Sequence, residues 1–550
     1  MLVRIRISPP VVPKRRVASL STPSETVAAK KQPLGASSRV AFGILISRIT
    51  GLARETVMAY FLGNSRMAGI FRAAFRIPNL LSNLFGEGVL SAAFITMYSK
   101  LRANGQDEDA EHLAAAVFGV LATVSASIVL VGVLFTPWII DLIAAGFKGE
   151  DRLLTIRLVR ILFPGAGLLV MSAWCLGVLN SHRRFLLSYA APVAMNATMI
   201  AALFIFGGSA PVALVTYLSW ACVLGSGLQF LVQLPHVLQL LPHFRPNLDF
   251  QSEHTRIVVR NFGPVFVSRG VVQISAYIDQ LISSFLGPIA VSTLSYGQFI
   301  ATFPVSMFSM SISAAELPVL SSATGTAEQI AEALRTRLQA GLRRIAFFIV
   351  PSAVALLLLG DVLAAGLFRM GRFHQSDAEY VWAALAGSSV GLLATSLGRL
   401  YSSAFYALLD TKTPLRFAMV RVALTTALGW LFALLVPHAL GLALPWSLAG
   451  LTASAGFAGW VEFVLLRRAL VQRIGNVSLP PAFLFKLWAI AGIAGACGYV
   501  MKLLIGVAYP RLLVVLVVAV YGVVYVAGTS QQDIDESKQT LQFLYRRLRI

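Results

Sequence analysis

Five polar residues recur at intervals of three and four along one segment: Arg72, Arg76, Asn79, Asn83 and Glu87. Residues at this spacing share one face of an α-helix, so the segment predicts a helix with a polar stripe. A guanidinium group can bind two phosphate oxygens with parallel hydrogen bonds, which an ammonium group cannot do. The stripe therefore favours a phosphate-bearing or otherwise acidic ligand.

The preceding apolar segment carries a second stripe, formed by Ser47, Thr50 and Arg54, with Arg48 and Glu55 beside it. Together the two segments hold four arginines and two acids. Each ionised side chain near the middle of a bilayer costs at least about 2.5 to 3.5 kcal/mol. The cationic surplus is therefore explained if an anion binds there.

An alternative reading needs no ligand. Arg54 could pair with Glu87 or Glu55, while Arg48 and Arg76 extend along the helix surface toward a membrane interface. In that case the two segments are only a neutralised helix pair.

The second half of the chain offers acids. Asp279 and Asp410, with Thr426 and the backbone of Val422, are candidate ligands for a coupling Na⁺, or carriers of a proton, because hard cations prefer oxygen ligands. Asp410 also fits a turn before Pro414.

Asp279 could instead neutralise Arg269. No arrangement of nucleophile, base and orienting group occurs in the sequence, so catalysis is not expected, and neither is a resident cofactor or metal.

The elements that position these residues follow from composition. Of 550 residues, 57% are hydrophobic and 13% charged, and the mean hydropathy is +0.76, which excludes an ordinary soluble enzyme. Apolar runs of helical length predict an all-α integral membrane protein with about fourteen transmembrane helices. They are expected near 39–62, 68–98, 113–144, 153–178, 185–206, 211–238, 257–286, 289–318, 331–366, 378–408, 414–436, 445–468, 483–505 and 511–528.

The formal net charge of +21 is a topology signal, because Lys and Arg gather on the cytoplasmic side of membrane proteins. With an even number of crossings, the basic loops fall on the side of the termini. Both termini are therefore predicted to be cytoplasmic, and a nucleic-acid partner is not needed to explain the charge.

An internal repeat predicts two lobes. SAAFITMYS at 91–99 recurs as SAAELPVLS at 313–321, and the FLG of 61–63 recurs at 285–287. Nearly equal offsets over more than a third of the chain indicate two six-helix lobes in a V, with a substrate site between them. The predicted parts are a disordered basic tail (1–36), an N-terminal lobe (37–240), a C-terminal lobe (241–475), two further helices (476–530) and a cytoplasmic tail (531–550).

Four runs also carry a family likeness. They are SRITGLARETVMAYFLG with FRAAFRIPNLLSNLFGEGVLSAAFITMYSKL, then GVLNSHRRFLLSYAAPVAMN, LFRMGRFHQSDA and FYALLDTKTP. In this order they resemble the MurJ (MviN) lipid II flippases, over about residues 40 to 530. The resemblance implies the multidrug/oligosaccharidyl-lipid/polysaccharide exporter fold, with two added helices that form a groove for a lipid tail.

The implied task is moving lipid II, an undecaprenyl-pyrophosphate-linked disaccharide peptide, from the inner to the outer leaflet of a bacterial plasma membrane for cell-wall synthesis. Arg48 and Arg54 match the family's cavity arginines, which makes them the expected pyrophosphate contacts. Asn79, Asn83 and Glu87 complete the expected first-lobe site.

The sequence departs from the family at three places. Gly69 stands where an acid is usual, Ser82 or Asn83 where a base is usual, and Gln298 where helix eight usually has an arginine. Arg72, Arg76 and Arg269 are the neighbouring residues expected to restore the charge.

Two alternatives stay open: a flippase for another polyprenyl-pyrophosphate-linked glycan, and a degenerate scaffold that moves nothing. The expected partners are lipid II, membrane lipids and proteins of cell-wall synthesis. Anionic headgroups could bind the basic tail, at up to about 1 kcal/mol per basic residue.

Overall fold

The computed structural model describes residues 34–82, 94–249, 252, 255–258, 260, 277–321, 326–408, 410–506 and 509–548. Within these ranges the chain is helical and has no strand, which confirms the all-α prediction. Three predicted site residues, Asn83, Glu87 and Arg269, lie outside the described residues, as do residues 1–33 of the predicted tail.

The first lobe is built around one long central helix. Its elements are α1 (Leu34–Leu62), α2 (Arg66–Ser82), α3 (Thr96–Ala103), α4 (Asp107–Leu134), α5 (Thr136–Ile143), α6 (Gly149–Ser181), α7 (Phe185–Ala190), α8 (Pro192–Phe206) and α9 (Pro211–Leu240). Helix α6 packs against α2, α4 and α9. Its Trp174 is fully buried, and the indole N–H donates to the carbonyl of Ala114 on α4. A helix that is apolar on most of its surface can be buried on all sides.

The second lobe has α14 at its centre. Its elements are α11 (Pro288–Pro304), η2 (Val305–Met310), α12 (Ser311–Ser321), α13 (Ala327–Phe368), α14 (Gln375–Ala407), α15 (Lys412–Trp430), η3 (Leu431–Leu435), α16 (Val436–Leu440) and α17 (Leu444–Ile474). Helix α14 packs against α17, α13 and α11. The close approach of α14 to α17 is made at Gly391 and Gly456, whose backbones are in contact.

Three further helices follow: α18 (Pro481–Ile505), α19 (Pro510–Gln531) and α20 (Asp535–Leu548). Helices α18 and α19 pack against each other and against α13. The hydroxyls of Tyr521 and Tyr525 on α19 donate to the carbonyls of Pro351 and Phe347 on α13. A helix-interior proline leaves a carbonyl without its intrahelical donor, and Tyr525 supplies one to the carbonyl four residues before Pro351.

Ten helices in the described residues are long and apolar enough to cross a membrane. They correspond to ten of the fourteen predicted helices. The remaining four are the first two of each lobe, near 39–62, 68–98, 257–286 and 289–318. The helices at 68–98 and 257–286 are only partly described, so the total of fourteen stays a prediction. Helix α1 is fully described and carries the polar residues that motivated a site.

Some predicted boundaries differ from the structure. The predicted helix 113–144 consists of two helices, α4 and α5, which meet at Phe135 because Pro137 starts a new helix. Pro304 ends α11, and the next six residues form the π-helix η2 before α12 continues. Proline removes an amide donor from the helical ladder, so a widened turn follows it.

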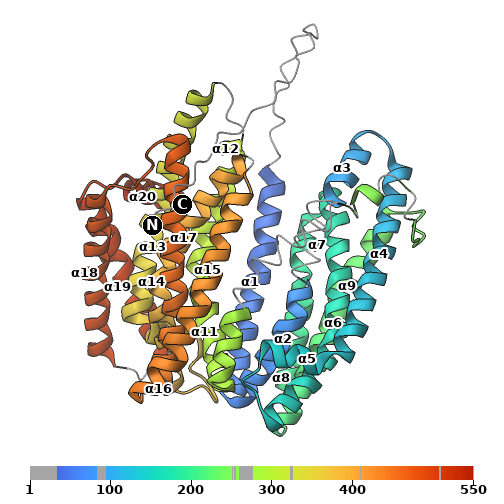
Figure 1. Ribbon diagram of the computed structural model, residues 1–550, viewed down its shortest axis with the longest axis horizontal. Coiled ribbons are helices and arrows are strands. Elements are labelled where there is room, and N and C mark those ends of the chain that lie inside the picture. The colour runs from blue at the N-terminus through green and yellow to red at the C-terminus, as the bar shows by residue number, and fades with distance from the viewer. Residues whose placement is uncertain are drawn as a thin grey trace, which may run out of the picture.

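The two lobes meet at one end and diverge at the other. In Figure 1 they are joined where α1 ends and separate toward the end where α1 begins, and α1 lies between them. At the joined end the Arg372 amide donates to the Tyr60 carbonyl at 2.9 Å, and the Asn64 side chain donates to the Thr293 hydroxyl at 2.8 Å. The inner faces of α1 and α2 are thus held against the second lobe.

Candidate functional site

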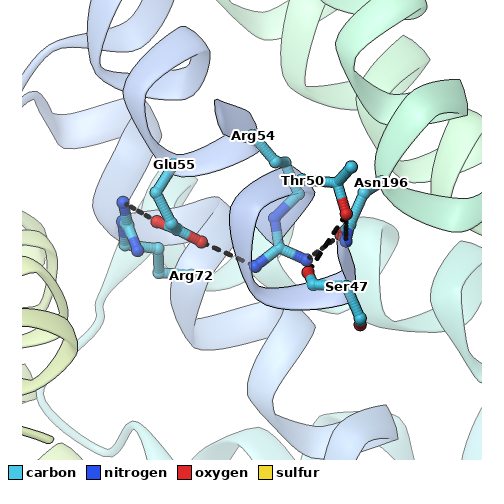
Figure 2. Close-up of polar contacts among 6 residues, drawn as sticks. All are labelled: Ser47, Thr50, Arg54, Glu55, Arg72 and Asn196. Carbon is cyan, nitrogen blue, oxygen red and sulfur yellow. Dashed lines mark hydrogen bonds and ion pairs between the residues drawn. The ribbon is translucent and has the colours of Figure 1, made fainter. Parts of the chain in front are cut away.

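The centre of the site is one carboxylate shared by two guanidinium groups (Figure 2). Glu55 Oε1 lies 2.7 Å from Arg54 Nη2, and Glu55 Oε2 lies 2.9 Å from Arg72 Nη2. The three side chains are only 16%, 8% and 10% exposed for Arg54, Glu55 and Arg72. Two positive charges against one negative charge leave the cluster with a net positive charge away from bulk solvent. We call Arg54, Glu55 and Arg72 the N-lobe triad.

Asn196 on α8 holds Arg54 in place (Figure 2). Arg54 Nη1 donates to Asn196 Oδ1 at 3.1 Å, and Asn196 Nδ2 donates to Thr50 Oγ1 at 3.1 Å. Asn196 is not among the site residues predicted from the sequence. The signal that could have found it is a polar amide inside the apolar run of α8, where an unsatisfied side chain would be costly.

Two N–H groups of the N-lobe triad have no hydrogen-bond acceptor among the described residues. Arg54 Nε and Arg72 Nε are buried, and within the described part of the chain neither has a hydrogen-bond partner. A buried donor without an acceptor costs about 1 to 3 kcal/mol, and more for a charged group. The triad therefore favours an additional anionic acceptor.

Arg48 lies about two helical turns before Arg54 on α1 and is exposed. Its Nη1 donates to Ser306 Oγ of η2 at 2.9 Å, which links the first lobe to the second. Among the described residues no carboxylate pairs with Arg48. Its charge adds to the surplus of the triad.

Arg76 and Asn79 continue the stripe on α2 beyond Arg72. The Tyr277 hydroxyl donates to the Arg76 carbonyl at 3.0 Å, and the Arg76 guanidinium lies 5.8 Å from the centre of the Tyr277 ring. Asp279 is two residues further along the helical segment 277–285, and Arg76 and Arg421 are the charged groups that act on it. Asp279 Oδ1 is buried and has no hydrogen-bond partner within the described ranges.

Gln298 lies on α11 and is partly buried. No hydrogen bond joins it to any described residue of the N-lobe triad. Tyr296, two residues earlier, is the α11 side chain that meets the triad, since its ring lies against Arg72.

Asp410 is not brought together with Val422 and Thr426, whereas the helical segment that carries Asp279 packs against the same helix α15, where Ile282 lies against Gly429. Asp410 accepts hydrogen bonds from the backbone amides of Lys412 and Thr413 and from the Thr413 hydroxyl, and it pairs with Arg473 at 2.6 Å. Val422 lies three turns further along α15, about 18 Å away at 1.5 Å per residue.

Thr426 donates to the Val422 carbonyl within α15. Burial alone would raise the pKa of Asp410, but the hydrogen bonds from Thr413 and the ion pair with Arg473 lower it to about 2. Asp410 thus acts at the start of α15, as the turn interpretation expected.

The second lobe holds a cluster that the sequence analysis missed. Arg421 on α15 pairs with Glu462 on α17 at 3.0 Å, and both act on Arg399 of α14. The signal was present, because these are ionisable residues inside apolar helices. We call Arg399, Arg421 and Glu462 the C-lobe triad.

The arrangement can bind an anion. The alternative reading was correct in pairing Arg54 with Glu55, but the same carboxylate also serves Arg72. Neutralisation is therefore incomplete among the described residues, and Arg48 carries a further charge without an acid.

A family model and several relatives match most of this chain. The family model described as "Lipid II flippase MurJ" matches residues 58–524. A lipid II flippase MurJ from Burkholderia cenocepacia is 33% identical over 436 residues, covering 78% of this chain and 82% of the relative. A probable lipid II flippase MurJ from Rhizobium tropici is 34% identical over 441 residues, covering 78% and 79%.

Solved structures agree on the fold. A lipid II flippase MurJ in an inward closed conformation superposes with a TM-score of 0.73 at 21% identity, covering 89% of this chain and 98% of that chain. An inward-facing multidrug resistance MATE family transporter of the MOP superfamily gives a TM-score of 0.63 at 17% identity, covering 80% and 100%.

Proposed function

Because this chain belongs to the MurJ family of lipid II flippases, we propose that it moves lipid II from the inner to the outer leaflet by alternating access. The chain is a multi-pass membrane protein with the two-lobe exporter fold. The cargo carries a pyrophosphate, and the N-lobe triad with Arg48 supplies the positive charge that this group needs. This surplus of guanidinium over carboxylate is the observation that carries the proposal.

The joined and divergent ends of the lobes give the direction of access. With both termini cytoplasmic in a bacterial plasma membrane, the divergent end faces the cytoplasm and the joined end faces outward (Figure 1). Arg48 lies at the middle of α1 (Leu34–Leu62), six residues closer to the divergent end than Arg54, so the triad lies deeper. The pyrophosphate would therefore meet Arg48 first, replacing the Ser306 hydroxyl as its acceptor, and then Arg54.

Residues of the N-lobe triad would link binding of the anion to opening of the joined end. When the pyrophosphate reaches the triad, it competes with Glu55 for the guanidiniums of Arg54 and Arg72. Arg72 also contacts the second lobe through Tyr296, so loss of the Glu55 pairing would loosen a contact between the lobes. Binding of the anion is in this way coupled to opening of the joined end.

Energy input is proposed to come from membrane potential or a Na⁺ or H⁺ gradient. Asp279 supports a cation-linked step because its Oδ1 is buried without a partner in the described residues and lies in the field of Arg76 and Arg421. Binding of the basic tail to anionic lipid or to proteins of cell-wall synthesis is proposed from charge alone. Catalysis is not part of the proposal.

Reconstitution in liposomes with fluorescent lipid II tests the function. Wild type should expose the label to an impermeant quencher, and Arg48→Ala or Arg54→Ala should abolish this exposure and fail to support growth after depletion of the native flippase. A scaffold would tolerate both substitutions. Transport of a lipid-linked glycan other than lipid II at an equal rate would instead favour the broader superfamily activity.

A further inference from the structure

The C-lobe triad repeats the stoichiometry of the N-lobe triad. Arg421 Nη1 lies 3.0 Å from Glu462 Oε2, with the side chains 30% and 13% exposed. Glu462 thus forms its ion pair with Arg421. Arg399 has no ion pair or hydrogen bond through its guanidinium to any described residue, and its side chain is exposed. Again two guanidinium groups accompany one carboxylate.

Arg399 is exposed although its helix is the most buried of the ten candidate spans, with 72% of its apolar window buried. Arg399 lies eight residues before the end of α14 at Ala407, which is about 12 Å along the helix axis. A guanidinium at this depth is costly unless water or an anion reaches it.

The neighbouring contacts show which way Arg399 points. Thr395, one turn earlier, lies against Gly459 of α17, and the Ser396 carbonyl accepts a hydrogen bond from Ser309 of η2. Successive residues of a helix are 100° apart, so Arg399 projects between these two directions. It therefore projects between α17 and η2.

The π-helix η2 connects this place to the first site. Ser306 of η2 accepts from Arg48, and Ser309 of η2 donates to α14 one turn before Arg399. A ligand held at Arg48 and long enough to pass η2 would reach Arg399. Lipid II has such a part, because its peptide extends from the sugar and carries carboxylates.

We propose that Arg399 is a second anion-binding position that receives a carboxylate of the lipid II peptide, while Arg48 and Arg54 hold the pyrophosphate. The inference rests on the proposed function and assigns each lobe its own part of the cargo. Arg421 and Glu462 pair with each other and act on Arg399 only through their charges. The three residues together carry a net positive charge, so a carboxylate is preferred over a neutral group.

Binding measurements on the full-length protein in nanodiscs separate the two sites. The ligands are lipid II, lipid II whose peptide carboxylates are amidated, and undecaprenyl pyrophosphate without sugar or peptide. Arg399→Gln should weaken binding of lipid II about tenfold, the size expected for one charge-assisted hydrogen bond. It should leave binding of the amidated and peptide-free ligands unchanged, and Arg399→Lys should retain part of the affinity.

Arg416→Gln is the matched control, because Arg416 is an exposed arginine at the start of α15 and its loss changes the net charge equally. The inference is overturned if Arg399→Gln weakens all three ligands alike, which would indicate bulk electrostatics or a pyrophosphate contact, or if it weakens none. The proposed function itself fails only if wild type binds none of the three ligands or binds lipid II without moving it.

Discussion

Arg72 of the first lobe lies over the ring of Tyr296 of the second lobe, with its guanidinium carbon 4.0 Å from the ring centre. The Tyr296 hydroxyl also donates to the Gly63 carbonyl at 3.1 Å. The arginine that shares Glu55 is therefore also part of the contact between the lobes. Charge at the site and closure of the joined end are linked through one side chain.

Tyr296→Phe should weaken the joined end while keeping the aromatic ring against Arg72. The ring stays in place, but a buried hydrogen bond between the lobes is lost, at about 0.5 to 1.5 kcal/mol. Cysteines placed near the joined end should react faster with an impermeant thiol reagent added outside. Tyr401→Phe is the control, because its buried hydroxyl donates to Val477 within the second lobe. Equal acceleration in both variants would contradict a specific role between the lobes.

Glu55→Gln should destabilise the protein strongly. Removal of one partner from a buried ion-pair network leaves the others uncompensated, at about 3 to 5 kcal/mol. Thermal unfolding in detergent measures the loss. Added inorganic pyrophosphate should raise the melting temperature of the variant more than that of wild type, because both guanidiniums then lack a carboxylate.

Glu332→Gln is the control for the same substitution, since Glu332 pairs with Arg335 on the surface and exposed pairs contribute less than about 1 kcal/mol. A Glu55→Gln variant as stable as this control would mean that the carboxylate does not hold the triad.

Gly69→Ala should prevent full closure of the joined end. A Cβ at Gly69 would overlap the carbonyl oxygen of Pro288 on α11, and backbone atoms cannot move aside easily. Overpacking of this kind costs about 1 to 3 kcal/mol. The expected readout is a lower melting temperature together with increased outside accessibility.

Gly522→Ala is its control, because nothing lies within 4 Å of that position and alanine favours the helix by roughly 0.4 to 1 kcal/mol. If the Gly69 variant had the melting temperature and the outside labelling rate of wild type, the close approach of Gly69 to Pro288 would not be required for closure of the joined end.

Asp410→Asn should lower stability at neutral pH by about 1 kcal/mol, the usual value of a helix-start hydrogen bond. The pKa of Asp410 is lowered to about 2, against about 3.9 in an unfolded chain. Its contribution is therefore full above pH 4 and disappears as the pH falls toward 2. The difference in melting temperature between wild type and the variant should shrink over that range. A difference that grew on acidification would contradict the pairing with Arg473.

The sequence by itself determined what the spacing of residues along single helices controls. It predicted the helical class, most of the long helices and the stripe on α2, because apolar period and run length are local properties. It also identified Arg48 and Arg54 through the family resemblance. It did not find the C-lobe triad, whose three members come from three helices and look isolated in the sequence.

Only the tertiary structure decided which partners these side chains meet. The sequence left Glu55 and Glu87 open as partners of Arg54, and residues adjacent on a helix diverge by 100°. In the structure the long arginine side chain turns back to Glu55, while α2 brings Arg72 to the other carboxylate oxygen. Likewise Asn196 and Ser306 reach Arg54 and Arg48 from distant elements. Such pairings depend on the rotation and depth of each helix relative to its neighbours, which the packing of the whole bundle sets and no local pattern records.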